Sequence, residues 1–499
     1  MIDVKNKRVL VVGLGKSGLA AAHFLKERGA RVTVSDARPA TLITELSDLL
    51  DQGFMVEAGS HGLLTFRRQD LIVVSPGVPM STPVLTQVRA MGAHIIGELE
   101  LGAQFLQGEV IAVTGSNGKT TTTSLLGEIL KAAGRPTLVG GNIGLPVTAM
   151  VAESVELSRR GKEAAGLSTT SAKSADSGRD DSSEVVGVEF GRDDSSEVVT
   201  GDDSGVWSVI EVSSFQLETV ETFRPRIAMV LNITPDHLDR HGDFKTYAAA
   251  KARITAFQTG EDFLVLNGED KETQMVAAKT KAQIYWFSGR RPIKQGAFVH
   301  GESILFVPRG GSKAEPVMPV AEISLVGAHN VENVLAAVCA ARLAGVESAT
   351  IRGAVRAFKA VEHRLEFVRE VAGVRYYNDS KATNVDATMK AMEAFAGGIH
   401  LILGGKDKDS DYRVLAPLVR ERVKTVITVG SAAEKIERQL DAVVKIESAE
   451  TLARAVAFAH EMAVAGDTVL LAPACSSFDQ FENYEQRGRV FKELVAALP

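Results

Sequence analysis

The chain has 499 residues, of which 56 are Lys or Arg and 62 are Asp or Glu, so its formal net charge is −6. This length predicts two to four domains at roughly 100–200 residues each. The mild acidity disfavours nucleic acid as a partner, because contact with its phosphates needs a basic surface or stripe. The two cysteines, Cys339 and Cys475, exclude a disulfide framework and favour a reducing, cytoplasmic environment. No run approaches the ~20 apolar residues of a membrane span, so no membrane insertion is expected.

The first predicted elements form an α/β unit with a glycine turn. A strand, the turn, a helix and a second strand are expected at residues 9–12, 13–18, 19–28 and 31–35, and a strand at 71–74 runs into Ser-Pro-Gly. Gly13, Gly15 and Gly18 let the backbone approach a diphosphate, and the N-terminus of the helix offers N–H groups to the anion. Asp36 ends the second strand, where its carboxylate can accept hydrogen bonds from a nucleotide. By itself this pattern indicates NAD binding.

A second glycine turn follows the strand predicted at residues 110–113. It reads Thr-Gly-Ser-Asn-Gly-Lys-Thr at 114–120 and opens a helix. Backbone N–H groups of such a loop cradle phosphates, the Lys119 ammonium reaches the terminal ones, and the Thr120 hydroxyl suits Mg²⁺. The usual first glycine of the motif would fall at Val113, and Gly115 is present instead. The position between a buried strand and a helix predicts a nucleoside triphosphate site.

Candidate metal ligands come after two further strands, expected at residues 206–210 and 227–231. Glu211 ends the first strand, and His237 follows the second. Mg²⁺ takes oxygen ligands and keeps several waters, so one or two carboxylates with substrate phosphates suffice. Histidine is an unusual ligand for Mg²⁺, and by itself His237 is equally a turn or capping residue. Lys251 lies in an alanine-rich helical stretch, where most lysines are solvated.

A third α/β unit begins near residue 374, with strands expected at 374–377, 400–403, 425–429 and 468–471. Polar clusters flank these strands, where open α/β sheets place ligands; they lie at residues 362–364, 378–384 and 404–409. Each cluster alone could be a turn, and together they indicate a second substrate site. We therefore expect three doubly wound modules, over residues 1–97, 98–360 and 361–499.

The stretch from about residue 153 to 205 breaks this pattern. It is rich in Ser, Asp, Glu and Gly, and Gly-Arg-Asp-Asp-Ser-Ser-Glu-Val-Val occurs at 178–186 and again at 191–199. Two copies are too few for a solenoid, which needs about three repeats. Low hydrophobicity and acidic charge favour a disordered surface insertion, either inert or serving as a docking or regulatory loop.

Taken together, these motifs resemble the Mur ligase family. The motifs that carry the resemblance lie at residues 114–120, 141–144, 211–218, 236–240, 327–330, 363–364, 378–384 and 473–481. Those at 378–384 and 473–481 resemble the branch of the family that adds D-glutamate. The resemblance implies an α/β protein of three domains: a Rossmann-like N-terminal domain that binds a UDP-sugar, a P-loop ATPase-like central domain, and a Rossmann-like C-terminal domain that admits D-glutamate. NAD binding would then be excluded.

The resemblance also implies a reaction. ATP, with two Mg²⁺ ions as the expected cofactor, would activate the carboxylate of UDP-N-acetylmuramoyl-L-alanine as an acyl phosphate. The amine of D-glutamate would then attack the activated carbonyl. The family is also expected to act as a cytoplasmic monomer.

Residue roles implied by the resemblance fall into five groups. The catalytic residues would be Lys119, His237 and Lys251. Contacts with ATP would come from Gly115, Ser116, Asn117, Gly118, Lys119, Thr120, Thr121, Asn330, Asn333, Arg364 and Asp379. Contacts with the UDP-sugar would come from Gly15, Lys16, Ser17, Asp36, Arg38, Gly77 and Asn142. Contacts with D-glutamate would come from Lys381, Thr383, Lys408, Ser477 and Tyr484. The metal would be held by Thr120, Glu211, His237 and Lys251, the last as a carbamate.

Other readings stay open. Folylpolyglutamate synthase shares the ATP core, but its ATP loop lies much nearer the N-terminus. A diaminopimelate- or lysine-adding Mur ligase would carry Asp-Asn-Pro-Arg, which this chain lacks. An NAD-dependent dehydrogenase fused to an ATPase module is an alternative from another class. A non-catalytic scaffold is disfavoured because Lys119, Glu211, His237 and Lys251 are all present.

Overall fold

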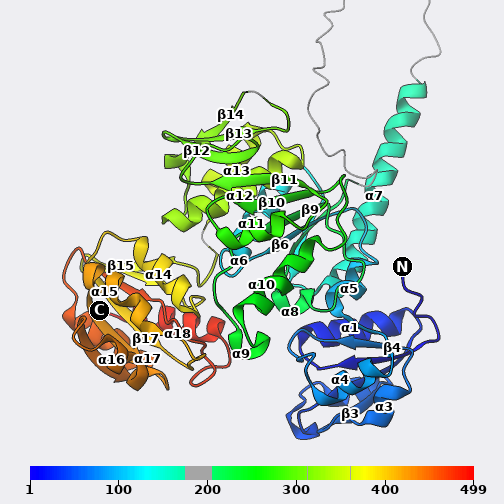
Figure 1. Ribbon diagram of the computed structural model, residues 1–499, viewed down its shortest axis with the longest axis horizontal. Coiled ribbons are helices and arrows are strands. Elements are labelled where there is room, and N and C mark those ends of the chain that lie inside the picture. Colours follow the sequence, from blue (N-terminus) through cyan, green and yellow to red (C-terminus); the bar gives the residue numbers. More distant parts are fainter. Residues whose placement is uncertain (175–204, 312, 360) are drawn as a thin grey trace, which may run out of the picture.

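The computed structural model describes residues 1–174, 205–311, 313–359 and 361–499. Within them, three β-sheets follow one another along the chain, each packed with helices (Figure 1). The predicted three-domain α/β architecture is confirmed. The domain boundaries at residues 97 and 360 stay predictions.

The N-terminal sheet is parallel and has the order β3-β2-β1-β4-β5. Its strands are β1 Arg8–Val12, β2 Arg31–Asp36, β3 Met55–Ala58, β4 Leu71–Val74 and β5 Ile95–Gly97. Its helices are α1 Lys16–Glu27, α2 Leu46–Asp51, α3 Leu63–Arg67 and α4 Pro83–Ala90. The strand order reverses between β1 and β4, and ligand crevices form at such switch points. The glycine turn and the Ser-Pro-Gly turn follow these two strands.

The central sheet has the order β14-β13-β12-β11-β10-β9-β6-β8-β7. Its strands are β6 Glu109–Thr114, β7 Thr137–Gly141, β8 Trp207–Glu211, β9 Ile227–Val230, β10 Phe263–Asn267, β11 Gln283–Ser288, β12 Gly296–His300, β13 Ser303–Val307 and β14 Glu315–Pro319. Its helices are α5 Glu98–Ala103, α6 Lys119–Ala132, α7 Val147–Ser174, α8 Ser214–Leu217, α9 Leu238–His241, α10 Phe244–Ala252, α11 Lys271–Ala277, α12 Ala328–Leu343 and α13 Ser348–Ala357. Strands β12 to β14 pair antiparallel, an extension that the expected doubly wound module lacks.

The C-terminal sheet has the order β15-β16-β20-β17-β18-β19. Its strands are β15 Glu366–Val371, β16 Val374–Asn378, β17 Ile399–Gly404, β18 Val423–Val429, β19 Lys445–Glu450 and β20 Thr468–Leu471. Its helices are α14 Val385–Glu393, α15 Ala416–Arg422, α16 Ala433–Leu440, α17 Leu452–Met462 and α18 Tyr484–Ala496. All its strands are parallel except β15, which pairs antiparallel with β16.

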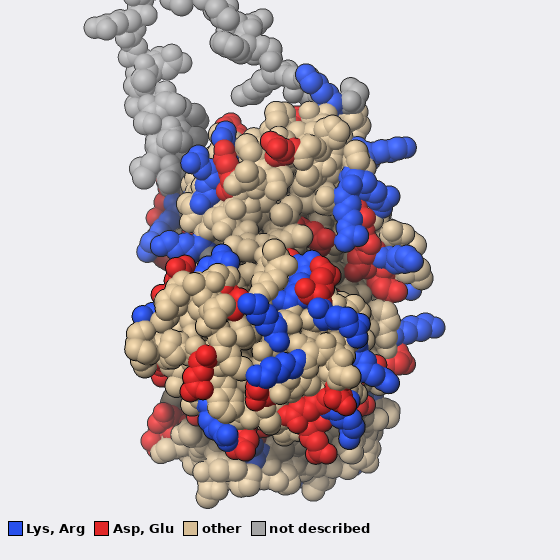
Figure 2. All heavy atoms as spheres, turned by 90° about the vertical axis from the view of Figure 1, so that its left-hand side faces the viewer, with Lys and Arg blue, Asp and Glu red and all other residues tan. Residues whose placement is uncertain are grey.

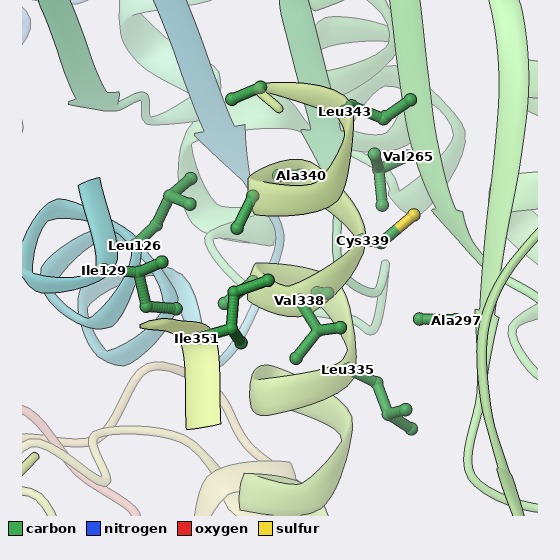
Figure 3. Close-up of a cluster of buried hydrophobic side chains, with 14 of the residues drawn as sticks. Leu126, Ile129, Val265, Ala297, Leu335, Val338, Cys339, Ala340, Leu343 and Ile351 are labelled. Carbon is green, nitrogen blue, oxygen red and sulfur yellow. The ribbon is translucent and has the colours of Figure 1, made fainter. Parts of the chain in front are cut away.

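Helix α12 lies at the centre of the largest core cluster (Figure 3). One side of it meets Leu126 and Ile129 of α6 and Ile351 of α13, and the other faces Val265 and Ala297 of the sheet. All five side chains are fully buried. This packing fixes α6, and with it the second glycine turn, at residues 114–120. Because this turn is predicted to bind phosphate, it is called the phosphate-binding turn below. Both cysteines of the chain are free and buried.

The prediction of a disordered insertion from residue 153 is wrong for its first part. Helix α7 continues to Ser174 (Figure 1). Beyond residue 153 the helix buries Ser154 and Ser158 and packs Leu157 against the core, and this packing outweighs the polar composition that suggested disorder. The repeated segment at residues 178–199 lies outside the described residues.

The surface carries mixed charge on the face that includes the C-terminal domain. Figure 2 shows Lys and Arg interspersed there with Asp and Glu. Within the described residues, none of the helices combines the length and the apolar character needed to cross a membrane.

Candidate active site

Three neighbouring strands of the central sheet end at one place. Strand β6 lies between β8 and β9, and all three are parallel. The phosphate-binding turn after β6, Glu211 at the end of β8, and the loop from Asn232 to His237 after β9 therefore meet at the carboxyl edge. Open α/β sheets bind ligands at this edge.

The phosphate-binding turn is held by backbone conformation and by the loop after β9. Gly118 has φ +84°, and a Cβ there would lie 2.2 Å from Asn333 Oδ1, so only glycine fits. The Asn232 side chain accepts from Asn117 N at 2.8 Å and donates to Asn117 O at 3.1 Å. Lys119 Nζ donates to the carbonyls of Gly115 and Ser116, each at 2.9 Å. The turn is thus pre-shaped around the Lys119 ammonium.

Glu211 is almost fully buried beside this turn. Its carboxylate accepts from Thr120 Oγ1 at 2.7 Å and from Asn142 Nδ2 at 3.0 Å. Burial would raise its pKa, but the positive charges of Lys119 and Arg364 outweigh burial and lower it. Glu211 therefore carries a negative charge at neutral pH.

His237 is placed by an unusual backbone conformation. Its φ of +53° lies in the left-handed region, at the start of α9, and its ring meets Phe215 edge-on at 5.0 Å. Burial lowers its pKa to about 4, although neighbouring Asp236 opposes this. The imidazole is therefore neutral at pH 7 and keeps a lone pair.

Lys251 is buried behind the phosphate-binding turn. Its Nζ donates to Gly115 O at 2.7 Å and lies 4.7 Å from the centre of the Tyr247 ring. Burial, with the nearby Lys119 charge, lowers its pKa well below the usual value. Lys251 is thus unlike most lysines of alanine-rich helices, because α10 turns this side chain inward.

Seven of the eleven predicted ATP contacts line a pocket between the central and C-terminal domains, called the nucleotide pocket below. Asn117, Gly118, Thr121, Asn330, Asn333, Arg364 and Asp379 all line it. Arg364 Nη2 donates to Thr120 Oγ1 at 2.5 Å, which joins the two domains at the turn. Burial raises the pKa of Asp379 to about 7.

A neighbouring cleft brings together predicted catalytic, metal and D-glutamate residues. It is lined by Lys119, Asn142, Glu211, His237, Lys381, Thr383, Lys408, Ser477 and Tyr484, among others. Lys381 Nζ lies 3.6 Å from the centre of the Tyr484 ring, and burial lowers its pKa to about 7. Lys408 Nζ lies 3.7 Å from Asp236 Oδ1. Two lysines of the C-terminal domain thus face the phosphate-binding turn of the central domain.

The predicted UDP-sugar residues of the N-terminal domain lie at the carboxyl edge of its sheet, after β1, β2 and β4. Lys16 and Ser17 begin α1, Gly15 precedes them, and Gly77 follows β4. The fold alone requires glycine at position 18, because a Cβ there would lie 1.8 Å from Gly13 O. A bound ligand is not needed to explain this glycine. Ser75 Oγ donates to Gly13 O at 2.6 Å and joins the two turns.

The carboxylate of Asp36 already has hydrogen-bond partners within the protein. Its carboxylate accepts from Leu14 N at 2.7 Å and from Arg38 N and Nε, each at 2.9 Å. Burial would raise its pKa, but these hydrogen bonds and the Arg38 charge lower it to about 2. The side chain therefore braces the glycine turn.

The turn after β4 and the loop after β9 are joined through Arg240. Its guanidinium donates to Pro76 O at 2.8 Å and to Val78 O at 3.2 Å, and stacks on Phe215 at 3.9 Å. Arg240 lies on α9, three residues beyond His237. The turn after β4 is thus fixed relative to the loop that carries His237.

Two of the four residues predicted to hold Mg²⁺, Thr120 and Glu211, fit that ion chemically. Thr120 and Glu211 present hard oxygen donors, one of them charged, 2.7 Å apart. Such a set suits Mg²⁺, which usually takes one or two carboxylates and keeps several waters. Another acidic group, formed by Glu362, His363 and Glu366, lies elsewhere; both of its carboxylates pair with Lys492.

Several residues of the cleft were not predicted. Asp236, Asn384, Ser476 and Phe478 line it, and His329 and Lys390 line the nucleotide pocket. All of these except Lys390 lie within motifs already recognised, so their neighbours in sequence could have indicated them. Lys390 carries no such signal.

A phosphate-binding turn that faces the lysines of a second domain defines a nucleotide-dependent enzyme of three α/β domains. The chain belongs to the Mur ligase family. Its models, described as Mur ligase MurD-like, N-terminal domain; Mur ligase middle domain; and Mur ligase, glutamate ligase domain, match residues 7–97, 113–186 with 199–341, and 363–475.

Curated relatives that are more than 50% identical match essentially the whole chain. A protein of Acidobacterium capsulatum is 59% identical over 99% of this chain and 97% of its own, and one of Koribacter versatilis is 53% identical over 99% and 98%. Both are named UDP-N-acetylmuramoylalanine–D-glutamate ligase.

Solved structures share the fold. A pseudomurein peptide ligase type C from Methanothermus fervidus has a TM-score of 0.56 at 18% identity, covering 98% of this chain and 99% of its own. The UDP-N-acetylmuramate-alanine ligase of Thermotoga maritima has a TM-score of 0.55 at 17% identity, with the same coverage.

Proposed function

We propose that this chain joins D-glutamate to UDP-N-acetylmuramoyl-L-alanine with cleavage of ATP to ADP and phosphate, a step of peptidoglycan precursor synthesis. The observation that carries the proposal is the cleft in which Lys119 and Glu211 face Lys381 and Lys408 across the domain junction. The names of the full-length relatives support the same reaction. Dependence on ATP favours a cytoplasmic location.

The two nucleotides would bind at different turns. The diphosphate of UDP would lie at the turn that begins α1, with the muramoyl end directed toward Asn142. ATP would lie between Asn330 and Arg364, with its terminal phosphate at Lys119. The Arg240 contacts with the turn after β4 support this arrangement, because they hold the first site in register with the second.

Activation of the acid follows from charge. The L-alanyl carboxylate attacks the γ-phosphoryl group and becomes an acyl phosphate, while ADP leaves. Lys119 would offset the negative charge that spreads over the phosphoryl oxygens. Mg²⁺, held by Thr120, Glu211, His237 and carbamylated Lys251, would supply further neutralisation of that charge.

Capture of the acyl group needs a bound, neutral amine. The two carboxylates of D-glutamate would pair with Lys381 and Lys408, and Thr383, Ser477 and Tyr484 would orient it. The amine then attacks the carbonyl, and phosphate leaves from the tetrahedral intermediate. Contact between the domains at Arg364 and Thr120 would help exclude water, which otherwise hydrolyses the acyl phosphate.

The test is phosphate release from ATP with UDP-N-acetylmuramoyl-L-alanine and a panel of amino acids. The proposal expects release with D-glutamate and almost none with L-glutamate, D-aspartate, L-lysine or diaminopimelate. Equal release with all of them would contradict it.

A further inference from the structure

Asp386 lies on the first turn of α14, at the junction with the central domain. Its Oδ2 atom accepts from Asn117 Nδ2 at 2.5 Å and from Thr234 Oγ1 at 3.2 Å. Asn117 belongs to the phosphate-binding turn after β6, and Thr234 to the loop after β9. One carboxylate oxygen of the C-terminal domain therefore contacts two separate loops of the central domain.

The residue that caps α14 makes a parallel contact. Asn384 Oδ1 accepts from Ala387 N at 2.8 Å and so caps the helix, while its Nδ2 donates to Asp236 Oδ2 at 3.1 Å. The start of α14 therefore contacts the loop that carries His237 through two side chains. The start of α14 therefore cannot shift without disturbing both the turn after β6 and the loop after β9.

A carboxylate at this place would oppose a polyphosphate unless its charge were balanced. Lys390, one helical turn further along α14, lies 3.1 Å from the same Oδ2 atom. Lys390 also lines the nucleotide pocket beside Asn117 and Gly118. The pair of Asp386 and Lys390 therefore presents a hydrogen-bond acceptor to the turn with little net charge.

We infer that Asp386 is a positioning residue for the ligation, which holds the phosphate-binding turn and the loop after β9 against the C-terminal domain through Asn117 and Thr234. The inference rests on the proposed function, because it concerns how the ATP site and the amino-acid site are kept facing each other. Asp386 lines neither the nucleotide pocket nor the cleft. It acts by favouring the closed arrangement in which both sites are complete.

If Asp386 only stabilised α14, its removal would have a smaller and purely local effect. Asp386 is an acidic residue in a first turn with a basic partner four residues on, which stabilises a helix by only ~0.2–0.5 kcal/mol. Glu434 offers a matched control, because it is an exposed acidic residue in the first turn of α16 in the same domain. If Asp386 served its helix alone, Asp386→Ala and Glu434→Ala would behave alike.

The first experiment compares steady-state kinetics of Asp386→Ala, Asp386→Asn and Glu434→Ala. Asp386→Ala should raise KM for both ATP and D-glutamate by about three- to tenfold, the scale of one or two lost hydrogen bonds. Asp386→Asn keeps an acceptor oxygen and should recover most of the loss. Affinity for the UDP-sugar alone, measured by calorimetry, should not change. Identical kinetics for Asp386→Ala and Glu434→Ala, or an equal loss in Asp386→Asn, would overturn the inference.

A second comparison tests the charge balance. Lys390→Met should raise KM for ATP, because it leaves the Asp386 charge unopposed beside the turn. Adding Asp386→Asn to Lys390→Met should lower that KM again. If the double variant stays as impaired as Lys390→Met, Lys390 serves the nucleotide directly and the charge balance is refuted.

Small-angle X-ray scattering separates this inference from the proposed function, because it needs no turnover. With a non-hydrolysable ATP analogue, wild type should be more compact than Asp386→Ala, and Glu434→Ala should match wild type. Identical scattering of wild type and Asp386→Ala would overturn the inference. Absence of D-glutamate-dependent phosphate release by wild type would instead refute the proposed function.

Discussion

Lys119 and Lys251 donate to the same acceptor, the carbonyl oxygen of Gly115, at 2.9 and 2.7 Å. Two ammonium groups this close repel each other, and desolvation lowers the pKa of both. Burial and the Lys119 charge lower the pKa of Lys251 well below its usual value, which favours loss of its proton. A neutral amine adds to CO₂ and releases one N–H proton, and the carbamate formed would carry negative charge toward Lys119.

The activity should therefore depend on bicarbonate. Enzyme depleted of CO₂ should lose activity and regain it when bicarbonate is added, while Lys251→Gln should be inactive with or without it. Recovery should weaken as pH falls through the lowered pKa of Lys251, because only the neutral amine reacts. Lys245→Gln, which alters an exposed lysine of the same helix, serves as control. A wild type indifferent to bicarbonate would refute the carbamate.

Removal of the Lys119 charge should stop the chemistry without loss of the first nucleotide. Lys119→Ala should lower kcat by about 10²–10³, the scale of one preorganised electrostatic group. Calorimetry should give an affinity for the UDP-sugar close to that of wild type, because that ligand binds at the N-terminal turn. Lys131→Ala, an exposed lysine at the other end of α6, should change neither quantity. Joint loss of turnover and UDP-sugar binding would mean that the two sites are wrongly assigned.

Chelation of Mg²⁺ should abolish phosphate release, and Glu211→Gln should make the enzyme demand more metal. Its carboxylate is the charged oxygen donor beside Thr120, so the Mg²⁺ concentration for half-maximal activity should rise about tenfold or more. Glu98→Gln is the matched control, because Glu98 is equally buried but accepts from Thr148 outside the cleft. An unchanged Mg²⁺ titration of Glu211→Gln would exclude Glu211 as a ligand.

Asp36 should stabilise the folded chain in a pH-dependent way. Its folded pKa of about 2 lies below the usual 3.8, so its contribution is present above pH 4 and is lost as pH falls toward 2. Asp36→Asn should lower the free energy of unfolding by on the order of 2 kcal/mol near neutral pH. The difference in melting temperature between wild type and Asp36→Asn should become smaller in acid. Asp48→Asn, at an exposed site of α2, should show no such gap, and a gap for Asp36→Asn that is constant with pH would contradict the ion-pair account.

The parallel strands could be predicted closely from the sequence. Those expected at residues 71–74 and 468–471 have these bounds in the structure, because short apolar runs between turns are typical of buried parallel strands. The antiparallel extension β12 to β14 could not be, since Glu315–Pro319 contains two prolines and a glutamate and such a segment is equally typical of a loop.

The site was predictable where chemistry directly follows a strand. Lys119, Glu211 and His237 stand after three strands that are neighbours in the sheet, so their convergence needs no knowledge of domain placement. Asp386 and Lys390 were missed because two opposite charges four residues apart are ordinary on any exposed helix. Only the packing of α14 against the central domain reveals their contact with the phosphate-binding turn.

The direct test of the central claim, that ATP energises an acid for capture by an amine, follows oxygen atoms. UDP-N-acetylmuramoyl-L-alanine labelled with heavy oxygen in its terminal carboxylate is turned over with ATP and D-glutamate, and the phosphate is examined by mass spectrometry. An acyl phosphate requires one labelled oxygen to pass into each phosphate released. Phosphate free of label, with amide product formed, would contradict the account.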